Sequence, residues 1–185
     1  MMKKFGLILL AMLPLLCGCK GRSLEKEAAG RIEQLSTMSE LGTVEYTISK
    51  TIRADKNRWY AIGEKKILFT CTAHLKAGID LSKADWSLTK VDGKSKSVTV
   101  TLPHATLLSF NMPPKEIRVA YQKSSLMRGD FTAEERNEIL KLGEEDIRTG
   151  VPELGILEDA ERNATAFFNA LFTGTGFRTV EVKFE

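Results

Sequence analysis

The stretch that decides the fold is ILFTCTAHLK, residues 67–76, in which apolar and polar side chains alternate from Phe69 onward. This period of two is typical of a β-strand with one buried face. The expected apolar face consists of Ile67, Phe69, Cys71, Ala73 and Leu75, and the expected polar face of Thr70, Thr72, His74 and Lys76. The pattern therefore predicts that Cys71 is a buried thiol and that His74 is exposed to solvent.

Alternation of the same kind extends on both sides of this strand. Further strands are predicted at residues 44–52, 86–91, 97–102, 105–110, 117–121 and 180–184. Asp92-Gly93 separates two of them and indicates a hairpin. The segment 77–82 (AGIDLS) is expected to interrupt the strand, with Gly78 in a turn and Asp80 or Ser82 capping a short helical turn.

Helical spacing of apolar residues appears in three other segments. Residues 24–38 carry an apolar stripe at steps of three and four. A capping box formed by Thr132 and Glu135 predicts a helix that runs to about Arg148. A further helix with the stripe Leu157, Ala160, Ala164, Phe167 or Phe168, and Leu171 is expected to stop at TGTG, residues 173–176. The expected fold is α+β: an antiparallel sheet of about five to seven strands, an N-terminal helix, and two C-terminal helices before a last strand.

The N-terminus reads as a targeting signal. Lys3 and Lys4 precede a twelve-residue apolar run, residues 5–16, which as a helix would be about 18 Å long and too short for a bilayer core of about 30 Å. The following residues, LCGC at 16–19, resemble a bacterial lipobox. That resemblance implies cleavage between Gly18 and Cys19 and a diacylglycerol on the Cys19 sulfur. The alternative is an ordinary secretory signal with two chance cysteines.

These features define the expected domains and location. Residues 1–18 are the signal peptide, 19–23 a lipid-anchored tether, and 24–185 a single α+β domain of ordinary size. The segment 20–23 contains no acidic residue. We therefore expect the body to face the periplasm, held by its lipid on the outer membrane in preference to the inner one.

Composition excludes some function classes. The formal charge of +3 falls to +1 when Lys3 and Lys4 leave with the signal, which is too weak to indicate nucleic-acid binding. No spacing suggests a nucleophile, base and orienting group, so we name no catalytic residue. His74 and His104 lack the carboxylate spacing of a metal site, and we expect no metal or other cofactor.

Three residues are candidates for ligand binding. Trp59 lies beside Tyr60 and two basic residues, Asp80 lies between apolar neighbours at a predicted turn, and Trp86 follows closely. A pocket near Trp59, Asp80 and Trp86 would suit a small ligand or a glycan. The simpler interpretation of Asp80 is a capping or turn residue.

The body resembles the bacterial domain-of-unknown-function 4230 family. The residues that carry the resemblance are LGTVEYT (41–47), GEKKIL (63–68), AGIDLS (77–82), TLP (101–103) and GFRTVEV (176–182). The resemblance covers most of residues 41–185. It implies an exported or membrane-anchored protein, but no established activity and therefore no functional residues.

The hypothesis that follows is a lipid-anchored envelope protein whose non-catalytic domain binds or scaffolds another envelope component. The membrane, through the lipid, and an envelope protein are the expected partners. The alternative is a small-ligand or glycan-binding lipoprotein. An enzyme whose polar residues are gathered only by the fold is a third possibility.

Overall fold

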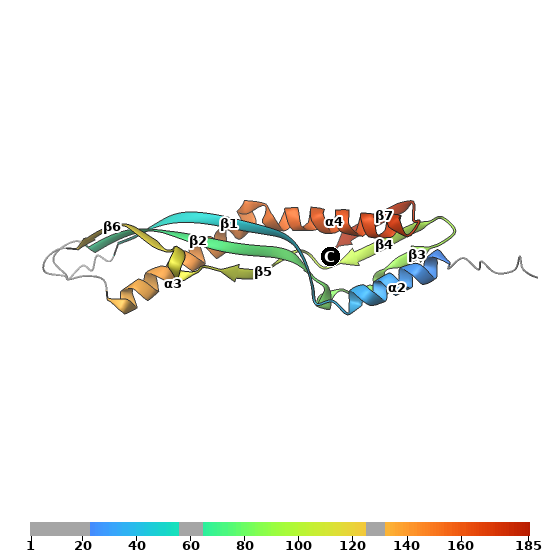
Figure 1. Cartoon of the computed structure of the whole chain (residues 1–185), viewed down its shortest axis with the longest axis horizontal. Coiled ribbons are helices and arrows are strands. Elements are labelled where there is room, and N and C mark those ends of the chain that lie inside the picture. Colours follow the sequence, from blue (N-terminus) through green and yellow to red (C-terminus); the bar gives the residue numbers. More distant parts are fainter. Residues whose placement is uncertain (1–22, 56–64, 125–131) are drawn as a thin grey trace, which may run out of the picture.

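The computed structural model describes residues 23–55, 65–124 and 132–185. These residues form an elongated rod, and the helix Leu24–Ser36 lies at the end where the described chain begins (Figure 1). The elements in chain order are α2 (Leu24–Ser36), β1 (Glu40–Asp55), β2 (Lys65–Asp80), η2 (Leu81–Lys83), η3 (Trp86–Leu88), β3 (Lys90–Asp92), β4 (Ser97–Leu102), β5 (Thr106–Asn111), η4 (Pro114–Glu116), β6 (Arg118–Ser124), α3 (Ala133–Gly150), η5 (Val151–Leu154), α4 (Ile156–Gly174) and β7 (Thr179–Phe184).

Two long antiparallel strands, β1 and β2, form the axis of the rod. Each has 16 residues, or about 53 Å at 3.3 Å per residue. β5 and β6 both pair antiparallel with the other edge of β2, one after the other along its length. We call this four-stranded sheet, β1-β2-β5 with β6 on β2, sheet A.

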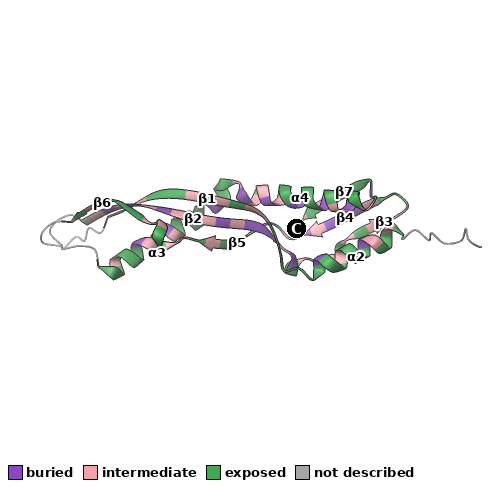
Figure 2. Cartoon of the chain, viewed as in Figure 1, coloured by how far each residue is buried: buried purple, intermediate pink, exposed green. Residues whose placement is uncertain are grey.

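Sheet A has one covered face and one open face. The covered face carries the predicted apolar residues of β2, which are buried, and α3 and α4 pack against it (Figure 2). The open face carries hydroxyl side chains that pair across the strands, with Ser49 to Thr72 and Thr51 to Thr70 each at 3.0 Å between oxygens. Such cross-strand pairs stabilise the hairpin without an apolar cover.

The second sheet, sheet B, has the order β3-β4-β7. β3 and β4 are antiparallel and β7 joins β4 in parallel. α4 packs against β1 and β2 of sheet A and against β7 of sheet B, so that it joins the two sheets into one core. Its buried residues are Ile156, Ala160, Ala164, Phe168 and Phe172.

Several local predictions are confirmed. The fold is α+β with the expected order of helices and strands. Cys71 is fully buried, and His74 lies on the open face. The Thr132 hydroxyl accepts a hydrogen bond from the Glu135 N–H, and the Glu135 carboxylate accepts one from the Thr132 N–H, which completes the capping box.

Other predictions are wrong in detail. Gly78 is not in a turn, because β2 stays extended to Asp80 and Gly78 pairs with Gly42. A Cβ at Gly78 would lie 2.1 Å from the Leu41 carbonyl oxygen, so the glycine is needed for the close approach of two strands. Residues 86–88 form a 3₁₀-helix, and only the last part of the predicted strand 86–91 is a strand.

The sheet and one helix stripe also differ from expectation. The seven described strands lie in two sheets, one of which contains the parallel β4–β7 pair. In α4 the buried stripe runs through Ile156 and Phe172 where the sequence suggested Leu157 and Leu171. The buried residues recur every four positions from Ile156 to Phe172, and Leu157 and Leu171 are partly buried beside them.

Candidate functional site

The residues singled out from the sequence fall into two groups. Gly18, Cys19 and Trp59 lie outside the described residues, as does the segment around Trp59. Asp80 and Trp86 are described. Asp80 immediately precedes the 3₁₀-helix η2, and Trp86 is the first residue of the next one, η3. The structure therefore places two of the five predicted site residues.

Asp80 is the N-cap of η2. Its carboxylate accepts hydrogen bonds from the Ser82 hydroxyl at 2.5 Å and the Ser82 N–H at 3.2 Å, and the Lys83 ammonium lies 3.0 Å away. The Ser82 hydroxyl, then Lys83, hold the pKa of Asp80 below its usual value. The capping role predicted as the simpler interpretation is confirmed, and these three partners occupy the carboxylate.

Trp86 is the first residue of η3 and is half-buried against the hydrophobic core. Asp85, just before it, caps this helix in the same way that Asp80 caps η2, through the Ser87 N–H and hydroxyl. Trp86 is thus fixed by packing and by the cap beside it.

Both histidines pair with carboxylates. On the open face of sheet A, His74 Nδ1 lies 3.1 Å from the Thr47 hydroxyl and Nε2 lies 3.0 Å from the Glu116 carboxylate. His104 Nδ1 lies 2.9 Å from Glu161 on α4. Within the residues that the structure describes, no group of three histidine, cysteine or acidic side chains could hold a metal ion.

The Thr47–His74–Glu116 row has the order of a hydroxyl, an imidazole and an acid. It lies on a flat open sheet face, and the His74 side chain is 43% exposed. Nucleophilic catalysis also needs donors that stabilise the developing oxyanion and a site that excludes water. This row supplies neither in the residues described, so its geometry fits a cross-strand link that ties η4 to β1 and β2.

One concave surface with a mainly apolar lining is a groove between α3 and the strand end formed by β2, η4 and β6. We call it the α3–β6 groove, and its volume is about 220 Å3. Its lining residues are Ile67, Phe69, Pro114, Ile117, Val119, Arg136, Ile139 and Leu140. The side chains of Val119 and Tyr121 on β6 are 54% and 52% exposed, which is high for large apolar residues.

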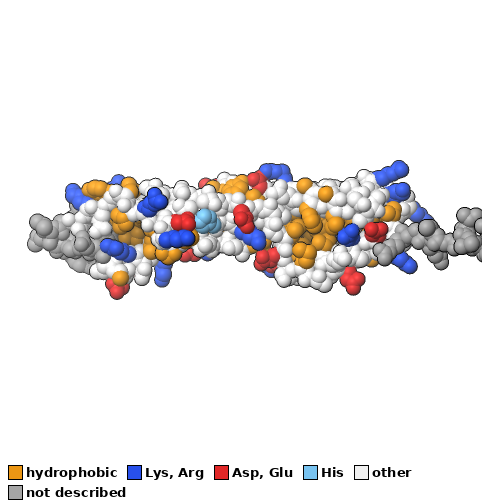
Figure 3. Space-filling model, in the orientation of Figure 1, with side chains coloured by type: hydrophobic (Ala, Val, Ile, Leu, Met, Phe, Trp, Pro, Cys, Tyr) orange, Lys and Arg blue, Asp and Glu red, His pale blue; other side chains and the backbone are white. Residues whose placement is uncertain are grey.

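Local structure explains how this groove forms. β6 pairs with β2 with a register shift between Leu68 and Phe69, and Val119 lies opposite Phe69 on the covered face. α3 packs on the same face, where Gly143 lies against Ile52 and Phe69. Among the described residues, the start of α3 leaves Val119 and Tyr121 of β6 exposed, and Figure 3 shows apolar side chains gathered at this end of the rod.

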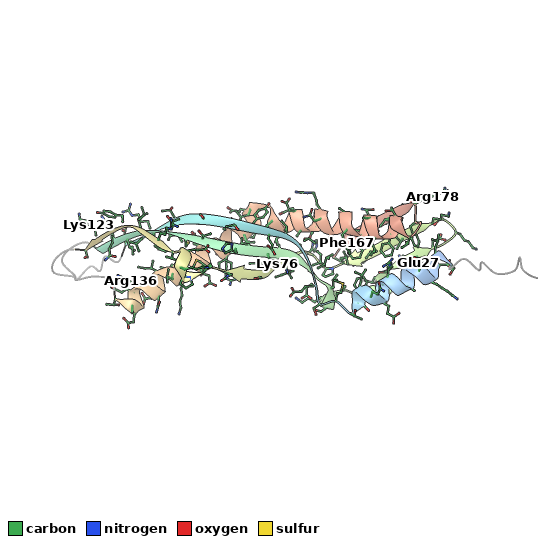
Figure 4. The ribbon with its side chains drawn as sticks, in the orientation of Figure 1. Glu27, Lys76, Lys123, Arg136, Phe167 and Arg178 are labelled. Atoms are coloured by element: carbon green, nitrogen blue, oxygen red, sulfur yellow. The ribbon has the colours of Figure 1, made fainter. Side chains whose placement is uncertain are left out.

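The groove and the N-terminal helix lie at opposite ends of the rod. In Figure 4, Arg136 of α3 and Lys123 of β6 lie at one end, whereas Glu27 of α2 lies at the other. Sequence reasoning missed the groove, because residues 117–121 read only as a strand. A signal in the sequence is the row Ile117, Val119 and Tyr121, three large apolar residues at a period of two after Pro113-Pro114. The register shift that places Val119 opposite Phe69 and Tyr121 opposite Leu68 appears only in the structure.

A hollow on α2 is the second concave surface of interest. Lys26, Glu27, Gly30, Arg31 and Gln34 line it, on the side of the helix that faces away from the core. Nothing lies within 4 Å of where a Gly30 Cβ would be. The buried side of α2 carries Ala28 and Leu35, so the apolar stripe packs on the domain.

Comparisons with known proteins identify a family. None of the helices in the described part of the chain is long and apolar enough to cross a membrane. No curated protein and no solved structure matches the chain. The model of the protein family of unknown function DUF4230 matches residues 33–182, which is most of the chain and includes both sheets. The chain therefore belongs to the DUF4230 family.

Proposed function

We propose that this protein is a lipid-anchored component of the bacterial cell envelope whose rod-shaped body binds another envelope protein without catalysing a reaction. The observation that carries the proposal is the placement of α2 and the α3–β6 groove at opposite ends of the rod (Figure 1). A body anchored beside α2 presents the groove far from the bilayer, where a partner can reach it.

The anchor is the lipid on Cys19. Four residues separate Cys19 from Leu24 at the start of α2, and an extended linker of four residues spans at most about 14 Å. The end of the rod that carries α2 therefore stays near the bilayer. Two or three acyl chains on one cysteine hold a protein stably, at about 0.8 kcal/mol for each buried CH2. We place the anchor in the outer membrane, with the body in the periplasm.

The partner is a protein segment with apolar side chains and an acidic residue beside them. The lining of the α3–β6 groove is apolar, and Arg136 supplies a positive charge to it. Full burial of a side chain such as Val119 is worth about 1.5–3 kcal/mol. A carboxylate on the partner that meets Arg136 would add orientation, since a guanidinium binds a carboxylate in a fixed geometry.

The small-ligand or glycan alternative has weaker support. It relied on Trp59, Asp80 and Trp86, of which Trp59 lies outside the described residues. Asp80 uses its carboxylate as a helix cap, and Trp86 packs against the core. We therefore retain the protein-binding function.

The anchor is tested by Cys19→Ser in cells grown with labelled palmitate. We expect the variant to lose the label and to leave the membrane fraction or stay unprocessed. Cys71→Ser is the matched control, because Cys71 is buried in the domain. This variant should keep both the label and the membrane location. Labelled palmitate on the Cys19→Ser protein would contradict the anchor.

The groove is tested by Val119→Asp, which places a charge on an exposed apolar side chain of the groove. Met38→Asp is the control, because Met38 is also exposed and apolar but lies between α2 and β1, at the opposite end of the β1–β2 pair from the groove. After chemical cross-linking in intact cells, the wild type and the Met38→Asp variant should be recovered in a complex with the same envelope protein. The Val119→Asp variant should be recovered without it. An identical set of proteins recovered with Val119→Asp would contradict binding at the groove.

A further inference from the structure

The end of the rod at which α2 begins is formed by three segments that are far apart in the sequence. Leu24 lies beside the loop between α4 and β7, with its Cδ2 atom 3.2 Å from where a Cβ at Gly176 would be. Glu25 lies beside the turn between β3 and β4, with its Oε1 atom 2.5 Å from where a Cβ at Gly93 would be. The start of α2 therefore contacts both the loop and the turn.

Backbone hydrogen bonds join the turn to the loop. The Lys96 carbonyl accepts from the N–H groups of Arg178 at 2.8 Å and Thr179 at 3.2 Å. Lys96 has a positive φ of 55°, a conformation that few residues other than glycine adopt. The two bonds place the backbone of Lys96 directly beside that of Arg178, at the end of the rod where Figure 4 labels Arg178.

Three cationic residues gather at this end, and we call them the basic tip: Lys94, Lys96 and Arg178. All three are exposed, and none has an ion-pair partner among the described residues. Figure 3 shows Lys and Arg side chains at this end of the molecule. Several cations on the sides of the rod pair with acids instead, as Lys50 does with Asp146. The basic tip thus carries positive charge that the protein itself leaves unpaired.

Two carboxylates lie at the same end and reduce its net charge. Asp92 accepts hydrogen bonds from two N–H groups of its own turn, at 2.8 and 3.2 Å, and Glu25 contacts the same turn. Lys26 and Glu27, in the first turn of α2, cancel each other in formal charge. Three cations less two acids leave this end with a charge of +1.

The position of the lipid selects the occupant of the basic tip. The tether from Cys19 to Leu24 spans at most about 14 Å, and Leu24 lies at this end of the rod. Lys20 and Arg22 of the tether add two positive charges, which raises the local charge from +1 to +3. The nearest anions are then the phosphate groups of the bilayer, and each lysine or arginine close to an anionic lipid surface strengthens the attraction to it.

We propose that the basic tip docks on the anionic phospholipid headgroups of the membrane that holds the lipid. This inference rests on the lipid anchor of the proposed function, because the anchor brings this end of the rod to the bilayer. Docked by its tip, the rod stands with its long axis directed away from the membrane. The α3–β6 groove is then held at the greatest distance from the bilayer that the rod allows.

Fluorescence quenching of the full-length, acylated protein in lipid vesicles tests the docking. A fluorophore on Ser95→Cys reports the basic tip, because Ser95 is exposed and lies between Lys94 and Lys96. The quencher is carried on the lipid headgroups. Vesicles of phosphatidylcholine alone hold the protein through its acyl chains only, whereas an equal mixture with phosphatidylglycerol adds anionic headgroups. Quenching should be stronger in the anionic vesicles.

Salt and label position supply two controls on the unmodified charges. Raising the salt from about 0.1 M to about 1 M shortens the Debye length from about 10 Å to about 3 Å, so the extra quenching in anionic vesicles should disappear. A fluorophore on Ser109→Cys should be quenched equally in both kinds of vesicle, because Ser109 is exposed on β5 in sheet A, away from the basic tip.

Removal of the three charges tests the residues themselves. In the Ser95→Cys background, Lys94→Gln, Lys96→Asn and Arg178→Gln together should abolish the extra quenching. Asparagine is chosen at residue 96 because it tolerates a positive φ better than most side chains. The matched control removes three exposed cations of η4, β6 and α3: Lys115→Gln, Arg118→Gln and Lys141→Gln. This control should keep the extra quenching.

The outcomes separate docking from anchoring. Equal quenching of the acylated protein in both kinds of vesicle overturns the docking and leaves the anchor standing. Extra quenching that survives in the tip variant, or that the control variant loses to the same extent, also overturns the docking. A protein that carries no acyl chains and associates with neither kind of vesicle overturns the anchor and the docking together.

Discussion

Gly78 of β2 lies directly beneath the backbone of Leu41 in β1, so close that a Cβ would approach the Leu41 carbonyl oxygen to 2.1 Å. The contact forms where β1 has a bulge between Gly42 and Val44 and the rod passes from sheet A towards sheet B. A backbone atom cannot move away as a flexible side chain can. The glycine therefore fixes how closely the two strands approach at this point.

Gly78→Ala should consequently destabilise the protein by about 1–3 kcal/mol, the range for overpacking in a well-packed region. The measurement is the free energy of unfolding from urea denaturation. Gly30→Ala is the control, because Gly30 lies within α2 with nothing near its Cβ position, and alanine should stabilise this helix by about 0.5–1 kcal/mol. A Gly78→Ala protein as stable as the wild type would show that the strands separate easily here.

Phe168→Ala should cost about 3–5 kcal/mol, because it removes a fully buried ring from α4 and leaves a cavity. The neighbouring ring of Phe167 is 39% exposed, and the two rings meet edge to face at 5.4 Å between centroids. Phe167→Ala should cost clearly less. Thermal unfolding of the two variants compares them, and equal losses would mean that the buried stripe is misassigned.

Asp80→Asn should destabilise the protein at neutral pH. The folded state lowers the pKa of Asp80, so the charged carboxylate contributes stability above its usual pKa near 3.8. That contribution is lost as the pH falls through the lower folded-state pKa. The difference in unfolding free energy between wild type and Asp80→Asn should therefore shrink in acid, and a constant difference at all pH values would contradict this.

Cys71 should react with a maleimide only after unfolding. Its side chain is fully buried, and desolvation raises the pKa of the thiol and so depletes the reactive thiolate. Peptide mapping by mass spectrometry, with and without denaturant, gives the extent of labelling at this residue separately from other cysteines. Equal labelling under both conditions would mean that the covered face of sheet A opens readily.

Local features of the sequence predicted much of the fold. The alternation around Cys71 and His74 assigns each to the correct face, and the Thr132–Glu135 spacing gives the start of α3 correctly. Both predictions depend on residues close together in the chain. Covalent geometry makes side chains alternate between the two faces of a strand, and it brings the N-cap residue within hydrogen-bond reach of the residue three positions later.

The missed features depend on contacts between distant segments. Gly78 signals a turn when only its neighbours are considered, but its partner Leu41 decides its conformation. The parallel pairing of Val182 with Val100 and the groove beneath Val119 arise from elements far apart in the sequence. Asp80 was found because caps are local, whereas the position of β1 at the edge of sheet A, with β2 as its one partner among the described strands, is known only from the structure.

The position of α4 has a consequence for how the chain acquires its structure. The Thr43 hydroxyl donates to the carbonyl of Ala160, a residue 117 positions later, and α4 covers both sheets. Contacts of such long sequence separation form slowly, because a large loop must close first. Until residues 156–174 are present and free to fold, the apolar face of the β1–β2 hairpin lacks the cover of α4, so depletion of the chaperones that hold unfolded chains should harm this protein before it harms shorter, more local folds.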